Sequence, residues 1–192
     1  MKKLAYLSLI SLLLLATSPT HAGNNESKSE SLSIHVKGHV LNTVGKVRKF
    51  SLNVYEKGQL IYKMKSYNGK FEYILPFNSE VMLEFIAEDH YVKRIAVRSS
   101  PKSDLKKVPT LILSINMLSS ARFPELSVLE DLLDFPSAFL AYNDKGKLLN
   151  LNKHASKVIY AELDKALKDI MAGKQIEITE VHLADKLLAE SK

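Results

Sequence analysis

Hydrophobic and polar residues alternate along the middle of the chain, from residue 50 to residue 97. A period of two residues is typical of β-strands that bury one face. Short polar segments interrupt the alternation at residues 56–58 and 67–70. Asn68-Gly69 is the strongest of these turn signals, because Asn-Gly readily adopts the positive φ angles of a tight hairpin turn. The pattern therefore predicts successive antiparallel strands, with a hairpin at each turn.

The same pattern extends to both sides of this region. Seven strands are predicted, at residues 32–40, 50–55, 60–65, 71–75, 81–85, 91–97 and 110–117. Gly38 interrupts the first strand, and a glycine within a strand often marks a bulge or a close approach of another backbone. Seven short strands with turn signals between them favour a β-sandwich.

The composition changes after Ala121. Residues 125–133 form either a short helix or an irregular apolar arm, and Phe135-Pro136 ends it. Two apolar runs at 138–142 and 147–151 flank a polar turn and predict a hairpin. A helix is predicted from about Asn152 to Met171, where Gly173 stops it. A short strand at 175–179 and a weaker helix at 180–188 complete the predicted elements. The apolar positions of the helix share one face: Ala155, Val158, Ile159, Leu163, Ala166, Leu167 and Ile170.

The N-terminus has the pattern of a secretory signal peptide. Lys2 and Lys3 precede an apolar run at 4–16, and Ala22 supplies a small residue before the predicted cleavage. The run is short for a membrane span, although an uncleaved N-terminal anchor is the alternative. No cysteine follows, so a lipid-modified cysteine anchor is not expected. We therefore predict a signal peptide at 1–22, a flexible tether at 23–31 and a periplasmic, outer-envelope or secreted protein with no transmembrane span after cleavage.

Composition narrows the functional classes further. The chain has 27 Lys and Arg residues against 21 Asp and Glu residues, so cleavage of the signal peptide with its two lysines leaves a net charge of +4. That is ordinary for a soluble domain, and basic residues are scattered among acidic ones, so we predict neither a concentrated basic patch nor nucleic-acid binding. The absence of cysteine excludes disulfides, and the absence of tryptophan excludes a tryptophan platform for sugars.

Three segments resemble one family of domains. They read VKGHV at 36–40, FSLNVYEKG at 50–58 and NGKF at 68–71. In these segments the chain resembles the carboxypeptidase regulatory-like domain, over residues 32–118. The resemblance implies a transthyretin-like, seven-stranded antiparallel β-sandwich without a catalytic zinc centre. His90-Tyr91 departs from the usual Gly-Tyr, so His90 is expected to adopt the backbone of that turn. Residues 119–192, predicted as a hairpin and helical extension, also resemble the corresponding part of certain bacterial envelope proteins, at Phe123, Pro136, Ala138 and Tyr142.

Catalytic and metal-binding patterns are weak. His35 and His39 share a strand face about 13 Å apart, too far to chelate one ion. Glu130, Asp131 and Asp134 have the spacing of a solvated helix face, although paired carboxylates can also serve general acid–base catalysis. Residues 88–89 offer too few oxygen atoms for calcium. Nucleophile-elbow and phosphate-loop motifs are absent from the sequence. We predict no enzyme activity, metal or cofactor.

Binding is the function that the pattern favours. The first hypothesis is a non-enzymatic exported scaffold of the cell envelope, which binds a protein through sheet edges, loops or the helix. The second is a carbohydrate- or peptidoglycan-binding accessory domain that uses surface tyrosines, and the third is an enzyme with scattered active-site residues. The helix face either covers the sandwich or binds a partner. Candidate partner-binding residues are Tyr62, Tyr73, Val158, Ile159 and Leu163.

Overall fold

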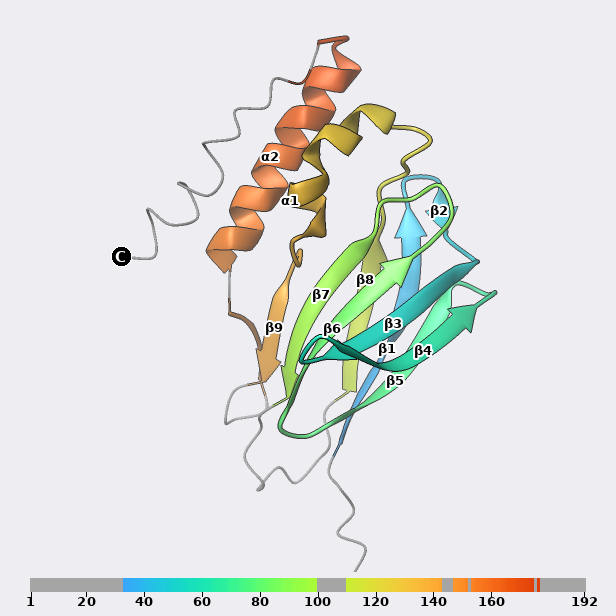
Figure 1. Ribbon diagram of the computed structural model, residues 1–192, viewed down its shortest axis with the longest axis vertical. Helices are drawn as coiled ribbons and strands as arrows, with labels where there is room; N and C mark the ends of the chain where they lie inside the picture. The colour runs from blue at the N-terminus through green and yellow to red at the C-terminus, as the bar shows by residue number, and fades with distance from the viewer. Residues whose placement is uncertain (1–32, 100–109, 143–146, 152, 175, 177–192) are drawn as a thin grey trace, which may run out of the picture. The chain divides into compact units, whose positions relative to one another are not determined.

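The computed structural model describes residues 33–99, 110–142, 147–151, 153–174 and 176, all within one compact unit, Ser31–Lys192. These residues form two β-sheets, a 3₁₀-helix and two α-helices (Figure 1). The predicted mainly β fold with two sheets and C-terminal helices is confirmed. The predicted signal peptide, the tether, the strand at 175–179 and the helix at 180–188 lie outside the described residues, apart from Ile176.

Sheet A is centred on β1. Its strands are β1 (Ser33–Asn42), β2 (Gly45–Lys46), β5 (Lys70–Pro76) and β8 (Thr110–Asn116). Strand β1 pairs in antiparallel fashion with β2 and β5, and in parallel with β8. Alternate residues of β5 are buried and exposed, as the period of two predicts. Sheet A therefore has one face toward the core and one toward solvent.

Sheet B has the order β10-β9-β7-β6-β3-β4 among the described residues. Its strands are β3 (Phe50–Glu56), β4 (Gln59–Ser66), β6 (Ser79–Ile86), β7 (Lys93–Ser99), β9 (Phe139–Tyr142) and β10 (Leu148–Asn150). Lys57 and Gly58, with φ angles of 49° and 79°, form the two-residue turn between β3 and β4. Strand β4 is thus an edge of this sheet, beyond β3.

The main core lies between the two sheets. Phe50 and Phe85 of sheet B meet Phe71 of sheet A with ring centroids 4.9–6.4 Å apart. The aliphatic side chains around these rings come from both sheets and include Ile34, Val36, Leu52, Val54, Leu75, Leu83, Val97, Leu111 and Ile115. Burial of these alternating positions is what holds the sheets together.

Two details of the predicted sandwich are wrong. Asn68-Gly69 does not close a hairpin, because β4 belongs to sheet B and β5 to sheet A. Gly69 does have the expected positive φ of 77°, but it turns the chain from one sheet to the other. The sandwich is also not wholly antiparallel, since β8 runs parallel to β1 and β9 runs parallel to β7. Local alternation does not reveal which distant strand becomes a neighbour.

Close backbone approach explains the glycine in β1. A Cβ atom on Gly38 would lie 1.9 Å from the carbonyl oxygen of Leu113 on β8, so only glycine allows these strands to pair here. The close approach predicted as one of two possibilities is therefore present. In the turn before Tyr91, where His90 replaces the usual glycine, the residue with left-handed backbone is Asp89, with a φ of 57°. His90 itself does not have a positive φ. His90 instead forms an isolated bridge with Ser119.

The C-terminal part continues the sandwich and adds a second, smaller core. The 3₁₀-helix η1 (Pro124–Leu129) leads into α1 (Glu130–Asp134), so the helical alternative for residues 125–133 is correct. Strands β9 and β10 form the predicted hairpin, and β9 extends sheet B beside β7 (Figure 1). Helix α2 (Lys153–Met171) packs Ile159 and Leu163 against Leu132. Gly173, with a φ of 67°, follows its end.

Candidate functional site

Strand β4 carries three exposed large apolar side chains, more than any other described strand. Leu60, Ile61 and Tyr62 are consecutive and are 50%, 47% and 38% exposed. Tyr62 lies opposite Val54 and Leu60 opposite Tyr55, so Ile61 is an extra residue between them. Val54 and Tyr55 point to opposite faces of β3, so Leu60 and Tyr62 lie on opposite faces of the sheet. The pairing of β4 with β3 thus changes register between Val54 and Tyr55, which marks a β-bulge. Because β4 lies at the edge of sheet B, backbone groups along its outer side have no strand partner among the described residues.

An aromatic pair closes the sandwich beneath this edge. The ring centroids of Tyr62 on β4 and Tyr73 on β5 are 5.0 Å apart, and Tyr73 is buried. Burial raises the pKa of Tyr73 above 10.0, with a further contribution from the charge of Glu56. The two predicted tyrosines are therefore together, but only Tyr62 has an accessible ring.

Two open grooves lie on either side of the end of β4. The larger has a volume of about 750 Å³ and lies between β4 and the outer face of sheet A, and the smaller, of about 350 Å³, lies along sheet B. Lys65, Ser66 and Tyr67 line both grooves. Tyr67 is 70% exposed, so its ring stands between the grooves and is accessible from solvent.

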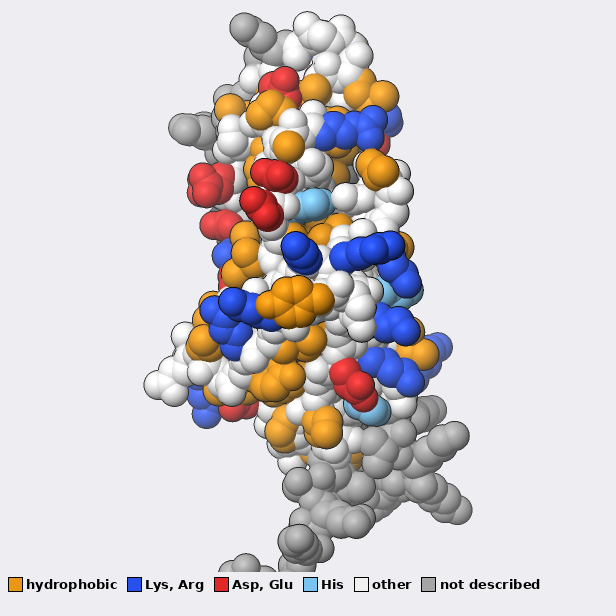
Figure 2. All heavy atoms as spheres, turned by 90° about the vertical axis from the view of Figure 1, so that its right-hand side faces the viewer, with side chains coloured by type: hydrophobic (Ala, Val, Ile, Leu, Met, Phe, Trp, Pro, Cys, Tyr) orange, Lys and Arg blue, Asp and Glu red, His pale blue; other side chains and the backbone are white. Residues whose placement is uncertain are grey.

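Lysines surround these grooves. The larger groove is lined by Lys37, Lys46, Lys65 and Lys70, and the smaller by Lys49 and Lys65. In Figure 2, Lys and Arg side chains gather around exposed hydrophobic side chains across this side of the molecule. The expectation that no concentrated basic patch exists is therefore wrong. These lysines come from β1, β2, β4, β5 and the segment before β3, so they are scattered in sequence and adjacent in space.

Few acidic groups balance this charge. Glu72 lines the larger groove, and its carboxylate contacts the imidazole of His35 on the neighbouring strand, an ion pair only when that ring is protonated. Glu88 lines the smaller groove. Within the described part of the chain, none of the five groove lysines forms an ion pair. The grooves therefore have an excess of positive charge that an anionic group could neutralise.

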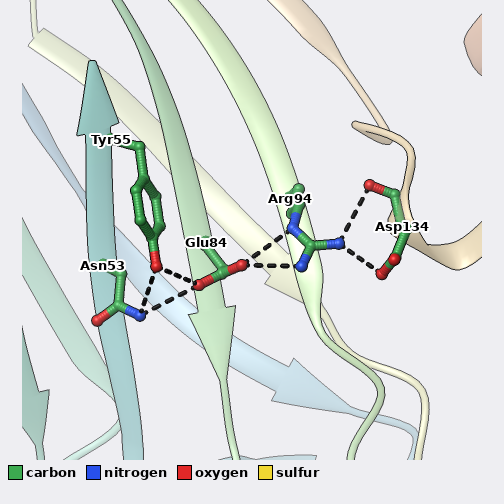
Figure 3. Close-up of polar contacts among 5 residues, drawn as sticks. All are labelled: Asn53, Tyr55, Glu84, Arg94 and Asp134. Atoms are coloured by element: carbon green, nitrogen blue, oxygen red, sulfur yellow. Dashed lines mark hydrogen bonds and ion pairs between the residues drawn. The ribbon is translucent and has the colours of Figure 1, made fainter. Parts of the chain in front are cut away.

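A second polar cluster is centred on Glu84 and Arg94, whose side chains bind each other. Glu84 lies on the outer face of sheet B, where its Oε2 accepts hydrogen bonds from Asn53 Nδ2 and Tyr55 Oη, both at 3.1 Å (Figure 3). Its Oε1 lies 3.0 Å from Arg94 Nε and 2.9 Å from Arg94 Nη2. Arg94 Nη1 reaches Asp134 Oδ1 at 2.5 Å. Both carboxylate oxygens of Glu84 are occupied, so this cluster fastens α1 to sheet B, while the buried Oδ1 of Asn53 has no hydrogen-bond partner among the described residues.

The remaining predicted residues lie elsewhere. Ile159 and Leu163 are buried in the second core, where they are not accessible to a partner, and Val158 is partly buried. The helix face thus packs within the chain. Of the predicted partner-binding residues, Tyr62 is the one that lies at the β4 edge, and sequence reasoning did not select Leu60, Ile61 or the groove lysines. The edge position of β4 depends on the order of strands, which local patterns do not reveal.

The histidines on sheet A have local partners. His35 pairs with Glu72, and His39 Nε2 lies 3.1 Å from Ser114 Oγ. In the described ranges, His, Asp and Glu side chains do not gather in groups of three that could hold a metal ion. Asp134 of the predicted acidic trio is paired with Arg94. No described helix has the length and hydropathy needed to cross a membrane.

Comparison with known proteins adds little. No family model matches the sequence, and no curated protein matches it. Among solved structures, 3-chlorocatechol 1,2-dioxygenase from Rhodococcus opacus 1CP aligns with a TM-score of 0.33 at 10% identity, over 45% of this chain and 59% of that one. Catechol 1,2-dioxygenases from Acinetobacter sp. ADP1 and Pseudomonas arvilla C-1 align with TM-scores of 0.32 and 0.31, at 8% and 7% identity. Each alignment covers 49% of this chain, and the chain spans 55% and 54% of these two enzymes. Similarity at this level defines neither a shared fold nor a shared activity.

Proposed function

We propose that this chain is a non-enzymatic interaction module that binds an extended segment of a partner protein along β4. The observation that carries the proposal is a strand edge that no other described strand covers, together with three consecutive exposed apolar residues, Leu60, Ile61 and Tyr62. In β-strand addition, a segment of the partner continues the ladder through backbone hydrogen bonds, and side-chain contacts on both faces supply specificity. An edge of this kind fits that mode of recognition.

The setting of this activity is also a proposal. The signal-peptide pattern at residues 1–22 supports export to the periplasm, the outer envelope or the medium, and a partner in the cell envelope. The motifs at 36–40, 50–58 and 68–71 support membership of the carboxypeptidase regulatory-like group of transthyretin-like sandwiches. The full occupation of Glu84 and the local pairing of His35 support a binding rather than a catalytic role.

A glycan-binding surface is the second candidate. The exposed ring of Tyr67, which lines two grooves, favours it, because a tyrosine ring offers an apolar face to a sugar and a hydroxyl at its tip. Failure of the chain to co-sediment with cell-wall polymer would remove this candidate.

Photocrosslinking from defined positions tests the main proposal. A photoreactive amino acid is placed at Ile61 on β4 and, as a matched control, at the exposed Ala161 on α2, in the full chain produced in its native cells. We expect a reproducible crosslinked protein from position 61 and none of that mass from position 161. Equal yields from the two positions, or crosslinks from position 161 alone, would contradict binding at the β4 edge.

A further inference from the structure

We infer that the partner segment is acidic, and that beyond its pairing with β4 it continues into the grooves lined by Lys37, Lys46, Lys49, Lys65 and Lys70. This inference rests on the proposed function, because it describes the chemistry of the segment that binds β4. It adds to that function a class of partner and a second contact surface, beyond the strand edge itself.

The position of the grooves relative to β4 supports a continuous binding surface. Lys65 and Ser66 are the last residues of β4, and both line both grooves. A segment that pairs along β4 and continues past Ser66 therefore enters a groove without changing direction sharply. In the larger groove it meets lysines from three other strands, and in the smaller groove it meets Lys49. Each lysine side chain is long enough to follow a carboxylate on a mobile segment.

The charge of β4 itself agrees with this. Lys63 and Lys65 are on one face of the strand, since residues two apart point the same way, and Lys57 lies in the preceding turn. Cross-strand neighbours of opposite charge stabilise a pair of strands, and like charges opposite one another destabilise it. A strand with acidic residues at alternate positions is therefore favoured beside β4.

Lys63 and Lys65 also make a second copy of this chain an unfavourable partner for the β4 edge. Two β4 strands paired edge to edge would bring their lysines together, and the bulge between β3 and β4 distorts the edge further. Lysines and bulges on edge strands are known devices against uncontrolled pairing, and here they leave the edge open to a partner of opposite charge. Charge thus selects the partner as well as attracting it.

Nucleic acids and acidic glycans, two other classes of polyanion, fit the grooves less well than an acidic peptide. The basic groups in the grooves are lysines and His39, and arginine, whose planar fork suits phosphate groups, is not among the lining residues. Nucleic-acid surfaces usually combine such groups with several stacking rings, whereas Tyr67 is the one strongly exposed ring in these linings. An acidic glycan has no backbone that could pair with β4. An acidic peptide segment uses both the edge and the grooves.

Binding of labelled oligopeptides tests the inference in the full chain. The probe is fluorescein-labelled deca-glutamate, with deca-glutamine as the uncharged control and polygalacturonate as the glycan polyanion. We expect deca-glutamate to bind, with an affinity that falls as salt is raised, and deca-glutamine not to bind. The triple variant Lys37→Gln, Lys46→Gln, Lys70→Gln should lose about tenfold in affinity. The matched variant Lys153→Gln, Lys157→Gln, Lys165→Gln, on exposed positions of α2, should stay within about twofold.

The outcomes separate this inference from the proposed function. Equal losses in the two triple variants, no binding of deca-glutamate, or binding of polygalacturonate alone would overturn the acidic-peptide assignment, while crosslinking from Ile61 would still stand. Loss in the groove variant alone, together with crosslinking from Ile61 to a partner that carries an acidic segment, would support both. Circular dichroism of each variant shows that the sandwich is intact.

Discussion

Two glycines with nearly the same φ angle differ in the space around them. Comparing them distinguishes the free-energy cost of a left-handed backbone from the cost of steric crowding. Gly58 and Gly69 have φ angles of 79° and 77°. A Cβ atom on Gly58 would meet open space, whereas a Cβ atom on Gly69 would lie 3.2 Å from the carbonyl oxygen of Val47. Gly69 also donates its N–H to Arg48 and accepts a hydrogen bond from the N–H of Val40. Its position at the corner between the sheets is therefore fixed on several sides.

Alanine substitutions at these two positions give the first prediction. Gly58→Ala should lower the free energy of unfolding by about 1 kcal/mol, which is the cost of the backbone conformation alone. Gly69→Ala should lower it by about 2–3 kcal/mol, because the same cost is joined by overpacking against Val47. Urea unfolding of both variants measures the difference. Equal losses would show that the corner tolerates a side chain.

Lys93 supplies a pH dependence at the residue scale. Its ammonium nitrogen lies 5.3 Å from the centre of the Tyr160 ring, and burial lowers the pKa of Lys93 from 10.5 to about 8. Below about pH 8 this lysine is charged in both the folded and the unfolded chain, so the folded state bears the cost of burying the charge. Between about pH 8 and 10.5 the unfolded chain binds the extra proton, and the contribution of Lys93 to stability rises with pH.

The variant Lys93→Met tests that sign. It removes the buried charge, so its advantage in free energy of unfolding over the unsubstituted chain should be largest at pH 7 and should shrink as pH rises from 8 to 10.5. Comparing the two chains at each pH cancels the titration of the tyrosines. A difference that stays constant from pH 7 to pH 10 would contradict the burial of this charge.

At the scale of elements, one ion-pair cluster fastens α1 to sheet B. Arg94 on β7 bridges Glu84 on β6 and Asp134 at the end of α1, with side chains that are 25%, 11% and 58% exposed. Although burial acts to lower it, hydrogen bonds and charges from Asp134 and Glu84 keep the pKa of Arg94 above its ordinary value. Glu84 is the inner end of the cluster and Asp134 the outer end.

The two ends should therefore respond differently to substitution. Arg94→Met leaves the buried carboxylate of Glu84 without its cation and should lower the free energy of unfolding by about 3 kcal/mol. Asp134→Asn removes only the exposed partner and should cost less than about 1 kcal/mol. Thermal or urea unfolding of the two variants measures this. A larger loss for Asp134→Asn would mean that the cluster is anchored from α1 and not from the sheet.

At this scale the sequence predicts where strands and helices occur, but it does not predict which strands lie side by side. The alternation of Leu52 and Val54 with polar residues identifies β3, and the apolar spacing of Ile159 and Leu163 identifies α2, because both signals are local. Asn68-Gly69 predicts the positive φ correctly but not the sheet that the next strand joins. That choice depends on core packing between distant segments, which no local pattern contains.

At the scale of the whole molecule, the same distinction applies to the candidate site. Tyr62 could be selected from the sequence as a surface tyrosine, but its position on an edge strand follows from the order of sheet B. Lys37, Lys46 and Lys70 are separated in sequence by other elements, and β1, β2 and β5 bring them to one groove. Net charge therefore gave no indication of where positive charge is concentrated.

Hydrogen exchange along β4 in the full chain tests the central claim most directly. In the free protein, amides of Gln59–Ser66 that point away from β3 should exchange rapidly, and those paired with β3 slowly. Addition of the partner recovered by crosslinking from Ile61 should slow the rapid set by at least about tenfold, because a new strand then accepts hydrogen bonds from them. Unchanged exchange along β4, with new protection confined to β8 or α2, would contradict the account.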